Sequence, residues 1–237
     1  MPNLSRLSSA SVAVLVLLKE IFLLSLEGRR VTLIILAKQL GVTPPAISRR
    51  AQKLVRRGLL ARDGACGLRL TETGRRLALY ALRKQEIFEA FLVCTLGYRW
   101  EELGNAGESA LRMDDELIER MYARSGRPAR CPHGLPIPTR EGQFSLGNTV
   151  ALAVLSPGQA ARVSHVLTRE GTLLSYLAEL GLRPGNHVTV VEHIPFGDLL
   201  KVRVNRDAAD QEHIISAALA QIVFAEVNPA QPSDTAR

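Results

Sequence analysis

The chain has 237 residues and carries 30 Lys and Arg against 23 Asp and Glu, a length that allows one large domain or two to three small ones. The charge is uneven, because residues 1–95 hold 16 Lys and Arg against 6 Asp and Glu, whereas the remainder holds 14 against 17. This asymmetry indicates that the N-terminal part binds a polyanion and argues against binding by the whole surface.

Cysteine usage and hydropathy exclude further classes. The three cysteines, Cys66, Cys94 and Cys131, are odd in number and lack CxxC spacing, which argues against a disulfide framework or a zinc ribbon. The apolar run near the N-terminus is interrupted by Lys19 and Glu20, so it falls short of the ~20 apolar residues that a membrane span requires. No convincing signal-peptide cleavage site follows it. We therefore expect a cytoplasmic protein without a membrane partner.

The segment 36–59, LAKQLGVTPPAISRRAQKLVRRGL, predicts a helix, a tight turn and a second helix. The first helix is expected to stop at Gly41, where a residue that takes positive φ is favoured. Thr43 is expected to cap the second helix, with Pro44 and Pro45 in its first turn, where missing N–H groups cost nothing. Apolar residues at helical spacing then form its packed side: Ile47, Ala51, Leu54 and Val55.

The opposite side of that second helix is basic and suits a DNA major groove. Its side chains offer donors to base edges and phosphates, and its cations release counterions. An ordinary solvated helix face is the alternative. However, a hairpin with Asp63-Gly64 at its turn follows, and a basic helix before a hairpin is typical of a winged helix-turn-helix. The residues expected to contact duplex DNA are Thr43, Pro44, Ser48, Arg49, Gln52, Lys53 and Arg56.

Helices dominate the chain as far as residue 125. They are expected over 8–25, 71–97, 100–111 and 113–123. Thr71 is expected to cap the long helix, and Asp114 or Asp115 the last one. The far half of the long helix carries more apolar groups than a solvent-facing helix tolerates, which predicts a homodimer: Ile87, Phe88, Phe91, Leu92 and Leu96.

The composition changes after Ser125. Residues 126–144, GRPARCPHGLPIPTREGQF, are rich in Pro and Gly and predict a linker. Short β-branched segments between turns then predict a small barrel, with strands over 149–155, 161–167, 187–192, 199–204 and 222–227 and helices over 173–180 and 214–220. The fold class is mainly α with a small β-barrel. The expected parts are a winged helix-turn-helix domain (1–72), a helical dimerisation domain (73–126), a Pro-rich linker (127–145), the barrel (146–228) and a disordered tail (229–237).

The order of these motifs resembles the diphtheria-toxin-repressor family of iron- or manganese-dependent transcriptional repressors over nearly the whole chain. The match rests on TETGRRLA at the start of the long helix, RMDDELIERM, CPHGLPIP, YLAELGLRPG and PFGDLLKVRV. The resemblance implies an SH3-like C-terminal domain, of the type also found in ferrous-iron-transport accessory proteins. It also implies a dimer that binds a palindromic operator in duplex DNA when loaded with Mn or Fe.

The metal-ligand positions that the resemblance implies are degenerate here. They fall on Val16, Gln85, Glu89, Gly107, Ala110, Leu111 and, in the barrel, Thr172. Only Glu89 offers a ligand, with Glu86 and Glu108 as possible substitutes, and a shift of one residue near Gly107 would change the set. Because Fe(II) and Mn(II) are held by several imidazole, carboxylate or thiolate ligands at once, we expect the metal switch to be weakened or lost.

The remaining chemistry-bearing residues are given no function. Cys131 and His133 stand two apart, but a zinc site needs about four ligands, so we interpret them as structural parts of the linker. Cys94 is expected to be a buried thiol, and the role of Cys66 stays open. Nothing resembles a phosphate loop or a nucleophile elbow, and we expect no enzyme.

The expected function is a dimeric DNA-binding repressor related to regulators of iron and manganese homeostasis. The alternative is a metal-handling or protein-interaction module that acts through its SH3-like domain. Five cations within residues 49–57 favour the repressor, because a winged helix that contacts proteins has no need of them.

Overall fold

The computed structural model describes residues 10–28, 30–64, 67–104, 106–206 and 209–227. The predictions for Cys66 and for the tail lie outside these residues. The chain divides into two compact units. The first takes in the chain up to Phe88 together with Ala106–Arg127 and Ile137–Phe144, and the second takes in Glu89–Asn105, Pro128–Pro136 and the chain from Ser145 onward.

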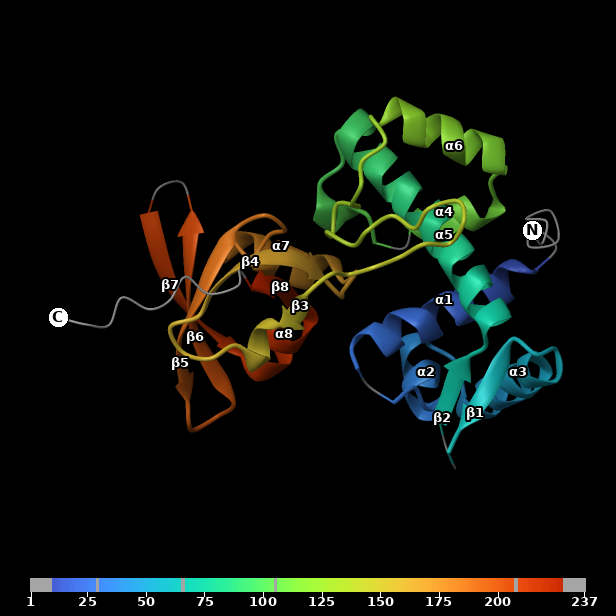
Figure 1. Cartoon of the computed structure of the whole chain (residues 1–237), viewed down its shortest axis with the longest axis horizontal. Helices are drawn as coiled ribbons and strands as arrows, with labels where there is room; N and C mark the ends of the chain where they lie inside the picture. Colours follow the sequence, from blue (N-terminus) through green and yellow to red (C-terminus); the bar gives the residue numbers. More distant parts are fainter. Residues whose placement is uncertain (1–9, 29, 65–66, 105, 207–208, 228–237) are drawn as a thin grey trace. The chain divides into compact units, whose positions relative to one another are not determined.

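The first unit is built from helices and one hairpin (Figure 1). Its elements are α1 (Val12–Leu26), α2 (Leu33–Gln39), α3 (Pro44–Arg56), β1 (Leu60–Asp63), β2 (Gly67–Leu70), the first part of α4 (Glu72–Leu96), α5 (Ala106–Ser109), the 3-10 turn η3 (Ala110–Arg112) and α6 (Asp115–Arg124). The strands β1 and β2 are antiparallel neighbours directly after α3. The helix, turn, helix and hairpin thus follow in the expected order.

Local chemistry explains where these helices begin and end. The Thr32 hydroxyl accepts from Ile35 N at 3.3 Å and caps α2, and Gly41 takes a φ of 61° in the turn that follows. Thr43 occupies the N-cap position of α3, but its side chain makes no capping hydrogen bond. At α6 the Asp114 carboxylate accepts from Glu116 N at 2.8 Å, as one of the two expected caps.

The long helix α4 has 25 residues and connects the two units. Lys84 and Arg83 hold α6 against it through ion pairs with Asp115 at 2.8 Å and Glu119 at 2.7 Å. Cys94 is exposed on α4, so the expectation of a buried thiol is wrong: the side chain lies in the last turn of the helix, beside the exposed Leu96. The continuous helix expected over 100–111 is also wrong, because Gly104 adopts a φ of 45° and separates η2 (Trp100–Glu102) from α5.

The second unit holds an antiparallel six-stranded sheet in the order β3-β8-β4-β5-β6-β7. Its elements are β3 (Thr149–Ala151), the 3-10 turn η4 (Leu152–Val154), β4 (Ala160–Val166), α7 (Gly171–Glu179), β5 (His187–Ile194), β6 (Leu199–Arg206), β7 (Ala209–Ser216), α8 (Ala217–Ile222) and β8 (Val223–Val227). Within the described residues β3 and β7 are the two edges, so the sheet does not close into the expected barrel by hydrogen bonding.

Two boundaries in the sheet differ from the prediction. The helix expected from Ile214 starts at Ala217, because residues 214–216 pair with β6 and the Ser216 hydroxyl then caps α8 by accepting from Leu219 N. The strand expected over 149–155 ends at Ala151 and continues as η4, which buries Leu152 in the core. In the part of the chain that is described, no helix combines the length and hydropathy of a membrane span.

Candidate metal centre and candidate nucleic-acid interface

Glu89, Cys131 and His133 form a buried cluster in the second unit. Their candidate ligand atoms all lie within 4.8 Å of one another, and His133 Nδ1 faces Glu89 Oε2 at 3.2 Å. Glu89 belongs to α4, whereas the other two belong to the Pro-rich segment between α6 and β3. The cluster therefore depends on tertiary folding.

The Pro-rich segment forms a tight turn fastened to β4. Gly134 N donates to Cys131 O at 2.9 Å, and Val166 N of β4 donates to His133 O at 2.9 Å. Gly134 has a φ of +88°, and a Cβ at this position would lie 2.1 Å from the Ser164 carbonyl oxygen. Glycine is therefore required for the turn that places Cys131 and His133 beside α4.

The orientation of the His133 ring suits metal ligation. Its Nε2 lies 3.3 Å from the Trp100 carbonyl oxygen, which can only accept, so a ring that ligates a metal through Nδ1 can donate its Nε2–H to this carbonyl. In the neutral ring Nδ1 then offers its lone pair on the side of Glu89. A ligating histidine whose other ring nitrogen donates to a backbone carbonyl is the usual arrangement in metal sites.

The three donors fit a divalent transition metal. Thiolate, imidazole and carboxylate ligands together suit ions such as iron, zinc or cobalt, at metal–ligand distances of about 2.0–2.3 Å for zinc. Atoms bound to one such ion lie within a few ångströms of each other, as they do here. Three protein ligands leave room for at least one further ligand.

A cation of the chain already contacts the same carboxylate. Arg169 Nε lies 3.3 Å from Glu89 Oε1, so a metal at this cluster shares Glu89 with a guanidinium. Thr172, at the position where the resemblance implies a barrel ligand, is exposed and donates to Glu170 at 2.8 Å. It is not part of the cluster.

In the first unit a buried lysine lies beside one of the substituted ligand positions. Lys19 is 1% exposed, and its Nζ donates to Gln85 Oε1 at 2.5 Å. The same nitrogen lies 3.1 Å from Glu20 and 3.9 Å from Glu108. The chain thus supplies its own positive charge next to Gln85. Two further positions of the implied set are buried apolar residues, Ala110 and Leu111.

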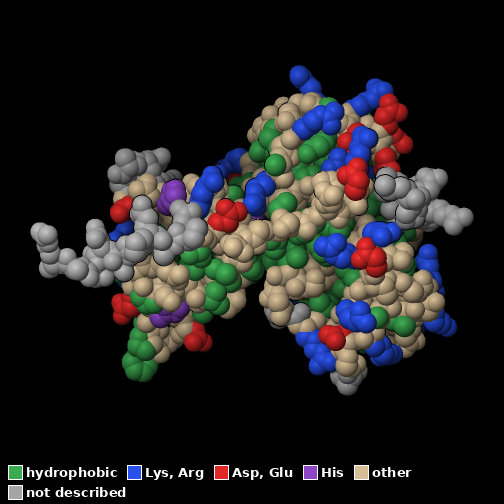
Figure 2. Space-filling model, viewed as in Figure 1, with side chains coloured by type: hydrophobic (Ala, Val, Ile, Leu, Met, Phe, Trp, Pro, Cys, Tyr) green, Lys and Arg blue, Asp and Glu red, His purple; other side chains and the backbone are tan. Residues whose placement is uncertain are grey.

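The candidate nucleic-acid interface is the outer side of α3. Ile47, Ala51 and Leu54 are buried as predicted, which leaves the polar residues on the outside. Figure 2 shows Lys and Arg side chains over the part of the chain that holds α2, α3 and the hairpin. Six of the residues expected to contact DNA are exposed and Ser48 is partly so: Thr43, Pro44, Arg49, Gln52, Lys53 and Arg56 are the exposed ones.

The structure brings together only part of the predicted metal set. Glu89 lies in the buried cluster, Glu108 lies near Lys19, and Glu86 is buried in the first unit. Cys131 and His133 are not recognisable as ligands from their own sequence segment alone, because no further Cys or His lies nearby in the chain. The C-x-H spacing in CPHG, together with the one carboxylate that the resemblance retained on the long helix, was the signal that could have found them.

Comparisons with known proteins agree with this architecture. Residues 71–139 match the iron dependent repressor, metal binding and dimerisation domain, and residues 150–227 match the FeoA domain. The iron-dependent repressor IdeR of Mycobacterium tuberculosis is 30% identical over 218 residues, 85% of this chain and 93% of that protein. A manganese-dependent transcriptional repressor in complex with manganese superposes with a TM-score of 0.82 at 27% identity, covering 91% of this chain and 100% of that chain.

A second solved structure, T. acidophilum IdeR, gives a TM-score of 0.75 at 29% identity and covers 90% of this chain and 96% of its own. The relatives therefore span nearly the full length of the described fold, and their identity exceeds what a shared fold alone explains. The chain belongs to the diphtheria-toxin-repressor family of metal-dependent transcriptional repressors.

Proposed function

We propose that this protein is a dimeric, operator-binding repressor whose DNA affinity rises when one divalent transition metal binds Glu89, Cys131 and His133. The observation that carries the proposal is the convergence of three buried ligand types from α4 and a distant turn. The expected loss of metal response rested on Val16, Gln85, Ala110 and Leu111. It does not extend to a centre made from other residues.

The chain's own residues suggest how such a centre is linked to DNA. A bound ion supplies positive charge that favours the thiolate and carboxylate forms of its ligands. Glu89 lies on α4, and the same helix begins directly after the hairpin at Glu72. The winged helix-turn-helix that we assign to α2, α3 and the hairpin is therefore covalently continuous with a ligand-bearing helix.

A cobalt titration tests the centre separately from DNA binding. Chelator-treated protein should bind one Co(II) per chain with a thiolate absorption band and quenching of Trp100, the single tryptophan, whose ring centroid lies 5.8 Å from that of His133. Cys131→Ser should remove the band, and His133→Ala should weaken binding at least tenfold. The exposed Cys94 provides the matched control, because Cys94→Ser should change neither signal. A band that survives in Cys131→Ser would disprove the assignment.

The response itself is measured as operator affinity with and without Mn(II) or Fe(II). We expect a gain of at least tenfold, about 1.4 kcal/mol of coupling, which His133→Ala should abolish. Equal affinity in both conditions would show that a metal, even if bound, is not the effector.

The nucleic-acid interface and the dimer are tested independently of the metal. Arg49→Ala with Lys53→Ala should weaken binding to a palindromic operator and flatten its salt dependence.

On α4, Phe88 and Phe91 are half-buried and Leu96 is 56% exposed, whereas Leu92 is buried within the chain. Leu96→Glu should therefore promote dissociation of the dimer in sedimentation, and a monomeric wild-type protein at micromolar concentration would contradict the proposal.

A further inference from the structure

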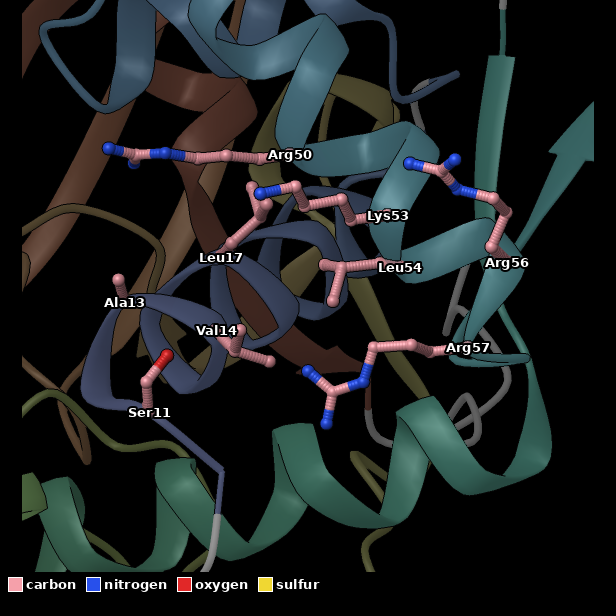
Figure 3. A pocket seen from close by; sticks show the side chains of 9 residues that line it. All are labelled: Ser11, Ala13, Val14, Leu17, Arg50, Lys53, Leu54, Arg56 and Arg57. Atoms are coloured by element: carbon pink, nitrogen blue, oxygen red, sulfur yellow. The ribbon is translucent and has the colours of Figure 1, made fainter.

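A pocket in the first unit lies between α1 and α3, whereas the metal cluster belongs to the second unit. Its volume is about 420 Å³, and its walls combine apolar residues with cations (Figure 3). The apolar part is formed by Ala13, Val14, Leu17 and Leu54. The rest is Ser11 and four basic residues: Arg50, Lys53, Arg56 and Arg57.

The four cations have no partner among the described residues. All four are exposed, none of their side chains takes part in an ion pair or hydrogen bond with the described residues, and no Asp or Glu lines the pocket. The sequence of α3, PPAISRRAQKLVR, contains no acidic residue. Unneutralised positive charge around an apolar floor is complementary to a molecule that is both anionic and apolar.

The helical repeat sets Arg50 and Arg57 of this pocket apart from Arg49 and Gln52 on the DNA-reading side of α3, with Lys53 between the two. At about 100° per residue, Arg50, Lys53 and Arg57 form one stripe, next to the core residue Leu54. Arg49 and Gln52 fall on another stripe, roughly 100° further round the helix. The first stripe borders α1, whereas the second has no neighbour in the core. Arg50 and Arg57 therefore need a different explanation from Arg49.

We propose that this pocket binds a small amphipathic anion, a carboxylate or phosphate head carried on a short apolar chain. The apolar body would lie against Val14, Leu17 and Leu54, and the head would be held by Arg50, Lys53 and Arg57. The volume lies within the range of about 300–1,000 Å³ that is usual for ligand sites. Neither a bare inorganic anion nor a DNA phosphate explains the apolar floor.

Occupancy would change the electrostatics of α3. A bound anion neutralises cations on the stripe next to the reading face, so operator affinity should fall and the salt dependence should become shallower. This consequence rests on the proposed DNA-binding function, whereas occupancy of the pocket does not. Ligand binding and operator binding are therefore measured separately.

Decanoate is the probe for the full-length protein, measured by calorimetry without DNA. We expect saturable binding of one decanoate per chain. Decanol, which lacks the charge, acetate, which lacks the chain, and inorganic phosphate should each bind at least tenfold more weakly. Arg50→Ala with Arg57→Ala should lower decanoate affinity at least tenfold, and so should Ala13→Phe, which fills the exposed edge of the floor.

The matched control removes two exposed cations of the same unit that lie outside the pocket, Lys38→Ala with Arg62→Ala, and should leave decanoate affinity unchanged. Circular dichroism verifies that each variant is folded. The proposal is overturned if decanol or phosphate binds as tightly as decanoate, if the control loses as much affinity as the pocket variant, or if decanoate does not bind. If decanoate binds as expected but operator affinity is unaffected, the site stands and its link to DNA binding is refuted.

Discussion

Lys19, which contacts α4 in the first unit, and Glu89, which belongs to the part of α4 in the second unit, are both buried charges, but their neighbours differ in kind. Lys19 is compensated by fixed groups of the chain, the carboxylate of Glu20 and the amide of Gln85. Glu89 faces a guanidinium, an imidazole and a thiol, a set that can also hold an ion. The difference shows that one helix can carry a contact to a buried lysine at Gln85 and a candidate metal ligand at Glu89, only four residues apart.

The largest effect is expected when the buried ammonium of Lys19 is removed. Lys19→Met leaves Glu20 buried without its cation, which should cost about 3–5 kcal/mol of stability in the first unit. Urea unfolding followed by circular dichroism should show the loss, while Trp100 fluorescence, which reports the core of the second unit, should shift much less. Adding Glu20→Gln should restore part of the stability, because it removes the stranded charge.

If both probes shifted equally in Lys19→Met, the two units would unfold as one. The distinction drawn between them would then not describe the stability of the protein. Lys38→Met, at an exposed site on α2, is the control for a general effect of losing a lysine.

A second test uses His165 in the second unit, the only histidine among the described residues whose pKa is strongly shifted. Burial, and then the charge of Arg130, lower the pKa of His165 to about 4, and its ring stacks on Phe224 at 4.7 Å. The unfolded chain takes up a proton near pH 6.5, before the folded one does. The stability that the neutral, buried His165 ring contributes is therefore complete above pH 6.5 and is lost as the pH falls toward 4.

From this one residue the second unit should lose about 2 kcal/mol between pH 7 and pH 5. His165→Gln should remove most of that pH dependence in Trp100-monitored unfolding, whatever its effect on stability at pH 7. The exposed His187 serves as control, and an unchanged slope in His165→Gln would show that another group titrates.

The smallest effect is expected at Arg169. Because its guanidinium lies 3.3 Å from Glu89 Oε1, it competes with a metal for the same negative charge. Arg169→Gln should therefore raise Co(II) affinity by several-fold, about 1 kcal/mol, in the titration described above. Arg183 contacts Trp100 with its guanidinium 5.4 Å from the ring centroid, and Arg183→Gln provides a nearby control. A lower affinity in Arg169→Gln would mean that the arginine supports the site.

Local patterns were sufficient for much of the fold. The periodicity of α3 and α4, the Gly41 turn and the Asp63-Gly64 hairpin are properties of short segments, and sequence reasoning located them within a few residues. No part of the strand β7 was predicted: ADQEH lacks the β-branched pattern, and the helix was expected to begin at Ile214. Pairing with β6 decides the structure of both halves.

The candidate site was harder to predict for the same reason. Lys19 was interpreted only as an interruption of an apolar run, because its partner Gln85 lies far along the chain. Cys131 and His133 were interpreted as structural, because Glu89 reaches them only after the turn at Gly134 packs on β4. Contacts between distant segments depend on tertiary packing, which spacing alone does not encode.

The buried Lys19 has a consequence for how the cell could govern this protein. Its ammonium is part of the polypeptide, so a chelator cannot remove it. A shortage of trace metals therefore cannot deprive the contact between α1 and α4 of its positive charge. By contrast, an ion held by the candidate cluster of Glu89, Cys131 and His133 would exchange with the surroundings, so under the proposed function this cluster is the part of the described chain that would respond to metal supply.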